Sequence, residues 1–112
     1  MQAALAVLKS LPAKRKVAIL GDMKELGAIS PDRHRQTGRL AAQAAGLVLT
    51  AGPLASEIHQ GAKELGMDAR HFEDTASLIQ NLSGLLLPGD LILVKASRSM
   101  HFEEVLEAIK RI

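Results

Sequence analysis

Cysteine, tryptophan and tyrosine are absent from this chain of 112 residues, and phenylalanine occurs only twice. Without cysteine the protein cannot form disulfides, thiolate metal sites or a cysteine nucleophile, and the chain fits a reducing compartment such as the cytoplasm. Because aromatic residues are so few, the core has to be built from aliphatic side chains, which suits helices packed on a sheet. The length fits a single domain over residues 1–112.

Long hydrophobic runs and concentrated charge are also missing. The formal net charge is +2, and the 14 basic residues are spread along the chain apart from the run at residues 14–16. Nucleic-acid surfaces need a basic stripe or aromatic stacking platforms, so we expect no nucleic-acid partner. The apolar runs are far shorter than the roughly 20 residues of a membrane span, and no charged segment precedes the first of them. We therefore expect a cytoplasmic protein without membrane insertion.

Helical and strand-like segments alternate along the chain. The expected helices are residues 3–11, 31–45, 53–66, 74–86 and 102–112, and the expected strands are residues 17–20, 47–50, 69–72 and 91–97. Ser30 and Pro31 are typical of an N-cap and the first helical position. Gly66 is typical of a helix end, and Asp74 is a second candidate N-cap. The alternation predicts an α/β fold with a mostly parallel sheet.

The predicted architecture is a Rossmann-like three-layer sandwich, with helices on both faces of a sheet ordered about 3-2-1-4 and right-handed crossovers. In that order the first and last strands are neighbours. The topological switch point, where open α/β sheets bind ligands, lies between their carboxyl ends. Two loops border it, residues 21–27 (GDMKELG) and residues 95–101 (KASRSMH). We expect any ligand site to lie between these two loops.

Polar residues follow the last strand. Lys95 comes directly after four apolar residues, Ser97 can donate or accept a hydrogen bond, and Arg98 has a planar guanidinium suited to carboxylate or phosphate. Ser99 is a candidate cap of the last helix, whose N-terminus favours an anion. These residues predict an anion pocket. The alternative is a solvated basic turn paired with acidic residues of the first loop.

Asp22 and His34 belong to the other side of the predicted switch point. Asp22 directly follows the first strand, where it is either a polar anchor for a ligand or the cap of an Asx-turn. His34 falls in the first turn of a helix, where the helix dipole disfavours imidazolium, so we expect a neutral hydrogen-bonding histidine; the alternative is an ordinary surface residue. His59, His71 and His101 show no metal-ligand spacing, so no metal site is expected.

Phosphate-binding motifs are missing. The stretch GDMKELG lacks the G-x-G-x-x-G spacing of dinucleotide sites, and no Walker lysine loop occurs anywhere in the chain. A catalytic triad or a carboxylate pair is not recognisable either. We therefore expect no catalytic residue within this domain.

Two stretches resemble a known family. KVAILGDMKELG with the following RHRQTG, and LILVKASRSMHFEEVLEAI near the end, are similar in order and spacing to the C-terminal domain of bacterial Mur ligases, of the type that adds D-alanyl-D-alanine. The resemblance covers nearly the whole chain. The Asp-Asn-Pro-Arg and Gly-Lys-Gly-His-Glu segments of the relatives that add diaminopimelate or lysine are absent.

The resemblance implies a cytoplasmic three-domain enzyme of peptidoglycan synthesis. Such ligases use ATP and Mg²⁺ to form an acyl phosphate on a UDP-N-acetylmuramoyl-tripeptide, which the amine of D-alanyl-D-alanine then attacks. The N-terminal UDP-substrate domain and the central ATPase domain would be absent from this chain. Its implied contribution is acceptor binding and closure over ATP, without turnover on its own.

By the same resemblance, Lys95, Ser97 and Arg98 would bind the acceptor, His34 would be a further substrate-binding residue, and Asp22 would face the nucleotide. Two other interpretations remain open. One is a ligase domain of the folylpolyglutamate synthase type, with glutamate as acceptor. The other is a non-enzymatic Rossmann-like module that binds a nucleotide or a protein partner.

One residue departs from the family pattern. Ala96 stands where the second loop of the family usually has glycine. If that position requires a positive φ or a close backbone approach, alanine would be strained there. The fine geometry of the loop is therefore an open question at the level of the sequence.

Overall fold

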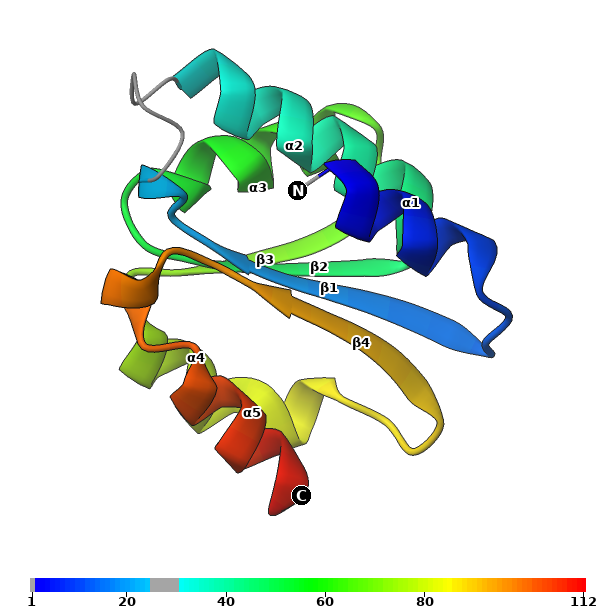
Figure 1. Cartoon of the computed structure of the whole chain (residues 1–112), viewed down its shortest axis with the longest axis vertical. Helices are drawn as coiled ribbons and strands as arrows, with labels where there is room; N and C mark the ends of the chain where they lie inside the picture. Colours follow the sequence, from blue (N-terminus) through cyan, green and yellow to red (C-terminus); the bar gives the residue numbers. More distant parts are fainter. Residues whose placement is uncertain (1, 25–30) are drawn as a thin grey trace.

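The computed structural model describes residues 2–24 and 31–112. Its sheet lies between two layers of helices, with α1, α2 and α3 on one face and α4 and α5 on the other (Figure 1). The elements are α1 (Gln2–Ser10), β1 (Arg15–Gly21), α2 (Pro31–Ala44), β2 (Leu47–Ala51), α3 (Ala55–Glu64), β3 (Asp68–Phe72), α4 (Thr75–Leu85), β4 (Asp90–Lys95), the 3-10 helix η2 (Arg98–Met100) and α5 (Glu103–Lys110). Among the described helices, none is long and apolar enough to cross a membrane.

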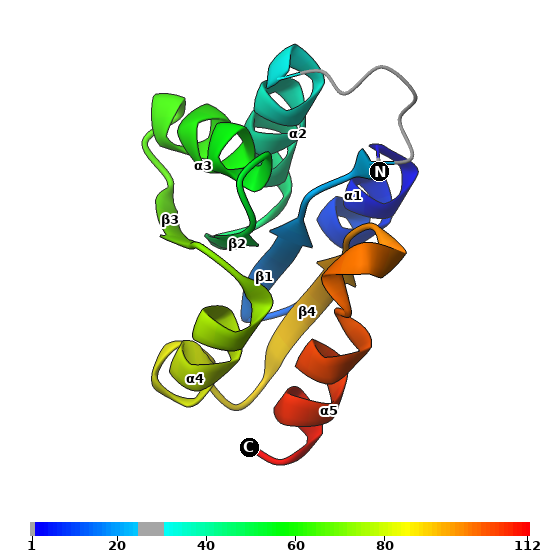
Figure 2. The same ribbon diagram turned by 90° about the vertical axis from the view of Figure 1, so that its left-hand side faces the viewer.

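The sheet has four strands in the order β3-β2-β1-β4, and every described pair of neighbouring strands is parallel (Figure 2). This confirms the Rossmann-like sandwich and the strand order expected from the sequence. Leu20 pairs with Thr50 of β2 and with Lys95 of β4. The carboxyl ends of these strands therefore meet at one edge, and the loops after β1 and β4 lie side by side.

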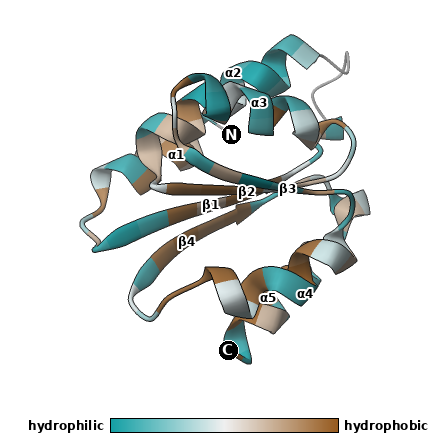
Figure 3. Cartoon of the chain, turned by 180° about the vertical axis from the view of Figure 1, so that it is seen from behind, coloured by the Kyte–Doolittle hydropathy of each residue, from teal (hydrophilic) through white to brown (hydrophobic). Residues whose placement is uncertain are grey.

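The core is divided by the alternation of side chains along the strands. Ala18 and Leu20 belong to the cluster under α1, α2 and α3, whereas Val17 and Ile19 belong to the cluster over α4 and α5. All four side chains are buried. The middle of the sheet is hydrophobic, and the outward faces of α2 and α3 carry hydrophilic residues (Figure 3). A strand that is covered by helices on both faces has a continuous run of apolar residues, and VAIL at residues 17–20 of β1 is such a run.

Several expected element ends are confirmed. The Asp74 carboxylate accepts the backbone N–H of Ser77 at 2.8 Å and so caps α4. Gly66 follows α3 with a φ of +74°. The second helix begins at Pro31, as expected, and its predicted N-cap Ser30 lies outside the described residues.

Two expectations near the end of the chain are wrong. β4 ends at Lys95, so Ala96 and Ser97 belong to the following loop rather than to the strand; the N–H of Ser97 leaves the ladder and donates to the chain beyond β1. Ser99 does not cap the last helix. It lies within η2, and Phe102 occupies the N-cap position of α5 without a side-chain cap.

Two glycines allow α2 and α3 to pack closely. A Cβ at Gly38 would lie 1.9 Å from the carbonyl oxygen of Ile58, and a Cβ at Gly61 would lie 2.1 Å from the carbonyl oxygen of Arg35. The Arg35 guanidinium also pairs with Glu57 at 2.6 Å. Because that pair is partly exposed, it contributes little. The close approach of the two backbones therefore sets the position of α2, and of the histidine in its first turn.

Gly38→Ala should destabilise the protein, because the added methyl group has no space against the backbone of α3. We expect the free energy of unfolding, measured in urea, to fall by roughly 1–3 kcal/mol or more. Gly84→Ala is the matched control: it lies in α4, and a Cβ there would meet nothing within 4 Å. This control should be neutral or gain up to about 1 kcal/mol. Equal stability of the two variants would contradict the packing described here.

The amino ends of β1 and β4 are joined by an ion pair. Arg15 donates to the Asp90 carboxylate at 2.9 Å through Nε and at 2.6 Å through Nη2, and the backbone N–H of Leu87 donates to the same carboxylate at 2.8 Å. Hydrogen bonding from Arg15 holds the pKa of Asp90 below its usual value, against the opposing effect of burial. The pair fixes β4 beside β1 at the end of the sheet opposite the two loops.

Asp90→Asn should lower stability at neutral pH by about 1.5–3 kcal/mol, because hydrogen bonds to a charged partner are lost. In the wild type this contribution is complete above the ordinary Asp pKa of 3.8 and is lost as the pH falls through the lower pKa of the folded state. The stability of the variant should therefore change less than that of the wild type between about pH 5 and pH 2. Urea unfolding at both pH values measures this. Glu107→Gln, which breaks an exposed pair with Lys110 in α5, is the control and should change the free energy of unfolding by less than about 1 kcal/mol.

Candidate functional site

Asp22 is buried against the start of α3. Its Oδ1 accepts the backbone N–H of Ala55 at 2.7 Å, so a carboxylate from the end of β1 caps a helix that begins 33 residues later. The side chain is 1% exposed. Gly52 makes room for it: the residue has a φ of +109°, and a Cβ there would lie 2.5 Å from Asp22 Oδ1. The other carboxylate oxygen, Oδ2, is buried without a hydrogen-bond partner among the described residues.

His34 is fully buried beneath the first turn of α2. Its Nε2 accepts the backbone N–H of Met23 at 3.1 Å. A nitrogen that accepts carries no proton, so the imidazole is neutral in this arrangement. The expected hydrogen-bonding role is therefore found, and the alternative of an ordinary surface histidine is wrong.

Ser97 joins the loop after β4 to the loop after β1. Its N–H donates to the carbonyl oxygen of Asp22 at 2.9 Å, and its Oγ accepts the N–H of Lys24. Its side chain is buried. Residues 22–24, which we refer to as the β1 hub, are thus hydrogen-bonded to α2, to α3 and to the loop after β4.

Lys95 and Arg98 lie at the surface beside the β1 hub. They line a groove of about 310 Å³ between the end of β4, η2 and the start of α5, together with Val94, Ala96, Ser97, Phe102, Glu103 and Leu106. Within residues 2–24 and 31–112, neither cation forms an ion pair. The alternative of a basic turn paired with Asp22 is wrong, because that carboxylate bonds to α3 instead. Glu25, the other partner considered, lies outside the described residues.

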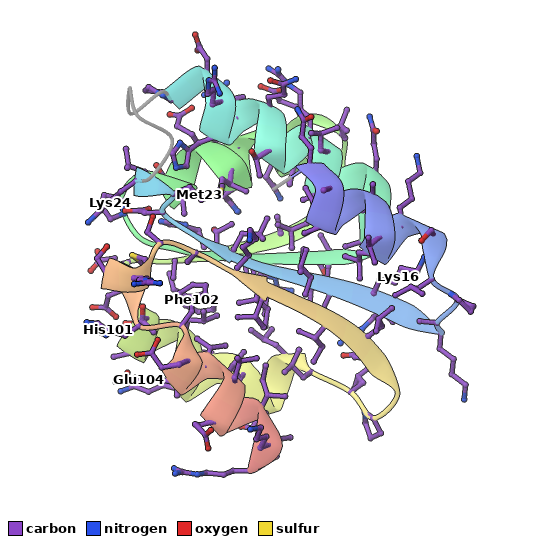
Figure 4. The ribbon with its side chains drawn as sticks, viewed as in Figure 1. Lys16, Met23, Lys24, His101, Phe102 and Glu104 are labelled. Atoms are coloured by element: carbon purple, nitrogen blue, oxygen red, sulfur yellow. The ribbon has the colours of Figure 1, made fainter. Side chains whose placement is uncertain are left out.

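The floor of the groove is set by the packing of Phe102 on β1. A Cβ at Gly21 would lie 2.7 Å from Phe102 Cζ and 2.8 Å from Ala96 Cβ, so glycine is needed for this contact. Ala96 itself is not strained: among the described non-glycine residues, only His101 has a positive φ, of 55°. Met23 and Lys24 lie at the same end of the sheet as Phe102 and His101, whereas Lys16 lies at the opposite end (Figure 4).

The structure therefore separates the predicted site residues into two groups. Asp22, His34 and Ser97 are buried and hold the loops together, whereas Lys95 and Arg98 are exposed in the groove. All five lie at the carboxyl edge of the sheet, as expected.

Two supporting residues were not among the sequence-based candidates. Gly52, followed by Pro53, is a recognisable turn signal at the end of β2, and it could have indicated the space that the Asp22 carboxylate fills. Thr75 donates from Oγ1 to the carbonyl oxygen of Met100 at 2.7 Å and so ties η2 to α4. No pattern in the sequence indicates that contact.

The described residues show cationic side chains in the groove but no preformed cluster of metal ligands. Within residues 2–24 and 31–112, no group of three or more His, Cys, Asp or Glu side chains is arranged to hold a metal. The full sequence contains no Walker lysine loop. The groove is lined by two exposed cations, Lys95 and Arg98, and by one carboxylate, Glu103. A guanidinium and an ammonium group are suited to bind a carboxylate or a phosphate.

The four-stranded parallel sheet in the order β3-β2-β1-β4, with helices on both faces, defines an α/β domain of the Rossmann-like class. Residues 1–98 match the family described as "Mur ligase, glutamate ligase domain". The UDP-N-acetylmuramoyl-tripeptide–D-alanyl-D-alanine ligase of Escherichia coli is 42% identical over 114 residues, covering 98% of this chain and 24% of that protein. The ligase of the same name from Synechocystis is 39% identical over 104 residues, covering 89% of this chain and 22% of that protein.

Solved structures agree with these sequence relatives. A crystal structure of MurF from Acinetobacter baumannii superposes with a TM-score of 0.84 at 28% identity, over 100% of this chain and 25% of that one. MurF from Thermotoga maritima in complex with ADP gives a TM-score of 0.73 at 27% identity, over 99% of this chain and 26% of that one. The chain belongs to the Mur ligase family, and the domain of that family that it matches is the one described as the glutamate ligase domain. It spans about a quarter of the length of these relatives.

Asp22→Ala should loosen the start of α3, because the first amide of that helix loses its cap. We expect the free energy of unfolding to fall by about 0.5–2 kcal/mol. The amide hydrogen of Ala55 should also exchange with solvent faster than this loss of global stability explains. Asp74→Ala, which removes the cap of α4, is the control and should leave local exchange at Ala55 unchanged. Wild-type protection of Ala55 in Asp22→Ala would show that the cap does not hold α3.

Proposed function

We propose that this chain is the C-terminal, acceptor-binding domain of an ATP-dependent ligase that adds D-alanyl-D-alanine to a UDP-N-acetylmuramoyl-tripeptide in peptidoglycan synthesis. The observation that carries the proposal is the presence of two exposed cations, Lys95 and Arg98, in a groove beside the β1 hub, with no ion pair to another described residue. The names of the most similar ligases support this acceptor and this donor. In the proposal, the N-terminal UDP-substrate domain and the central ATPase domain are supplied by other parts of a longer protein.

The acceptor dipeptide carries a carboxylate that suits the groove. Arg98 can bind it through two parallel N–H donors, and Lys95 adds a point charge at the end of β4. We assign Ser97 and His34 an indirect part in substrate binding, because both are buried and fix the loops on which the groove depends. Asp22 would serve the nucleotide side in the same indirect way, through the turn at residues 52–55 that it holds.

ATP and Mg²⁺ belong to the proposal for the whole enzyme. A structural relative is a complex with ADP. The described part of this chain has no cluster of three metal-ligating side chains, and the sequence has no Walker lysine loop. We therefore assign both mainly to the central domain, with this domain closing over them. We also assign the whole enzyme to the cytoplasm, in agreement with a chain that has no cysteine.

In the full-length ligase that carries this chain, Lys95→Ala and Arg98→Ala should each raise the KM for D-alanyl-D-alanine or lower kcat. Losing one charge-assisted contact of about 1.5–3 kcal/mol corresponds to roughly a tenfold to hundredfold effect. Steady-state phosphate release at varied dipeptide measures this. Lys110→Ala is the control, since that side chain is 71% exposed and pairs only with Glu107 in α5. Unchanged kinetics in both groove variants would remove Lys95 and Arg98 from the acceptor site.

An acceptor screen on the same enzyme tests the alternatives. Ligation of D-alanyl-D-alanine and not of L-glutamate supports the proposal, whereas the reverse preference indicates a ligase of the folylpolyglutamate synthase type. No ligation of either acceptor would favour a non-enzymatic binding module. ATP-dependent ligation by the 112-residue chain alone would contradict the assignment of ATP to another domain.

A further inference from the structure

A second polar cluster lies beside β3, the outer strand on the opposite side of the sheet from β4 and the groove. β3 is the outermost strand on that side, beside α3 (Figure 2). The ring centroids of His59 in α3 and His71 in β3 are 5.8 Å apart, with the ring planes tilted by 41°. Both rings line a cavity of about 360 Å³ at the outer edge of β3. The proposed ligase function uses neither of them.

The hydrogen bonds of Thr50 orient the His71 ring. Thr50 Oγ1 donates to the carbonyl oxygen of Arg70 at 3.4 Å and lies 2.7 Å from His71 Nδ1. The 2.7 Å contact has two possible directions, which depend on the His71 tautomer. In the tautomer that donates from Nδ1–H to Thr50 Oγ1, His71 Nε2 has a lone pair that a metal ion can use. A hydrogen bond at one ring nitrogen is what usually orients a histidine that binds a metal through the other.

The neighbouring ring has a polar atom without a partner. His59 Nδ1 is buried and makes no hydrogen bond within the described part of the chain. A buried nitrogen without a partner is unfavourable unless something satisfies it. The ring of His59, whose Nδ1 has no partner among the described residues, is therefore next to the ring of His71, which Thr50 orients.

Both rings are held in the neutral form. Burial lowers the pKa of His59, and electrostatic repulsion from the neighbouring His71 and Lys63 lowers it further. Burial also lowers the pKa of His71, and this effect exceeds the opposing attraction of Asp22 and Glu73. At neutral pH the two imidazoles therefore keep the lone pairs that a metal ion requires.

We propose that His59 and His71 form a two-imidazole site for a divalent transition-metal ion, such as Zn²⁺, with water in the remaining coordination positions. Imidazole nitrogen is a suitable ligand for zinc, copper and nickel. Among the described residues no further His, Cys, Asp or Glu completes a cluster of three, so the site is a weak, open one. A bound ion would join α3 to the edge strand β3 and would satisfy His59 Nδ1.

Titration of the chain with ZnCl₂ tests the proposal. By calorimetry at about pH 7.5 we expect one Zn²⁺ per chain, with an increase in Tm, and by NMR the imidazole signals of His59 and His71 should move together. His59→Gln and His71→Gln should each weaken binding at least about tenfold, and Thr50→Val should weaken it by roughly tenfold through loss of ring orientation. Binding should also fall below about pH 6, where protons compete for the same nitrogens.

His101→Gln is the matched control. His101 is exposed and lies 3.4 Å from Glu103, so this pair is a surface position at which an imidazole and a carboxylate could take up zinc. This variant should bind like the wild type. No saturable binding up to about 1 mM Zn²⁺, binding that survives both His59→Gln and His71→Gln, or binding lost in His101→Gln would each overturn the proposal. If a variant fails to fold, NMR shifts of the wild-type rings decide: movement at His59 and His71 supports the site, and movement at His101 alone overturns it.

Discussion

The hydrogen bonds of residues 22–24 hold the carboxyl edge of the sheet together. Where β1 ends, its backbone groups lose their ladder partners and require others. His34 from α2 and Ser97 from the loop after β4 supply them, and the Asp22 carboxylate in turn satisfies the first amide of α3. Three connections that are far apart in the sequence therefore share one small buried cluster. The loop that carries the two exposed cations is fixed as part of that cluster.

The parallel sheet was accessible from the sequence, because short apolar runs such as VAIL and LVLT alternate with helical segments. The order of its strands was expected because 3-2-1-4 is the order of a common Rossmann half. The hydrogen-bond partners of the polar side chains could not be predicted from the sequence. Asp22 could be placed at the edge of the sheet, but its bond to Ala55 spans 33 residues and depends on the positive φ of Gly52. The early end of β4 has the same origin, because the N–H of Ser97 turns to the β1 hub instead of continuing the ladder. Local periodicity carries no information about such contacts.

The scarcity of aromatic residues has a direct structural counterpart. With few large side chains to fill space, neighbouring helices of one layer pack by close approach of their backbones, as α2 and α3 do at Gly38 and Gly61. The one aromatic side chain in the buried core, Phe102, packs where Gly21 leaves room for it. Because α2 is held so closely on α3, His34 is held at a fixed height above the end of β1. Small residues in the core thus determine the geometry of the β1 hub.

The burial of Asp22 also decides the charge of the groove. A carboxylate at the end of β1 that was free to turn toward β4 would neutralise Lys95 or Arg98, and an incoming carboxylate would then have to displace it. Its engagement by the N-terminus of α3 prevents this, while the exposed cations keep their hydration until a ligand arrives. The bond that fixes α3 to the end of β1 therefore also keeps the Asp22 carboxylate away from Lys95 and Arg98. The acidic side chain that the described residues place beside these two cations is Glu103, which comes from the start of α5 instead of from β1.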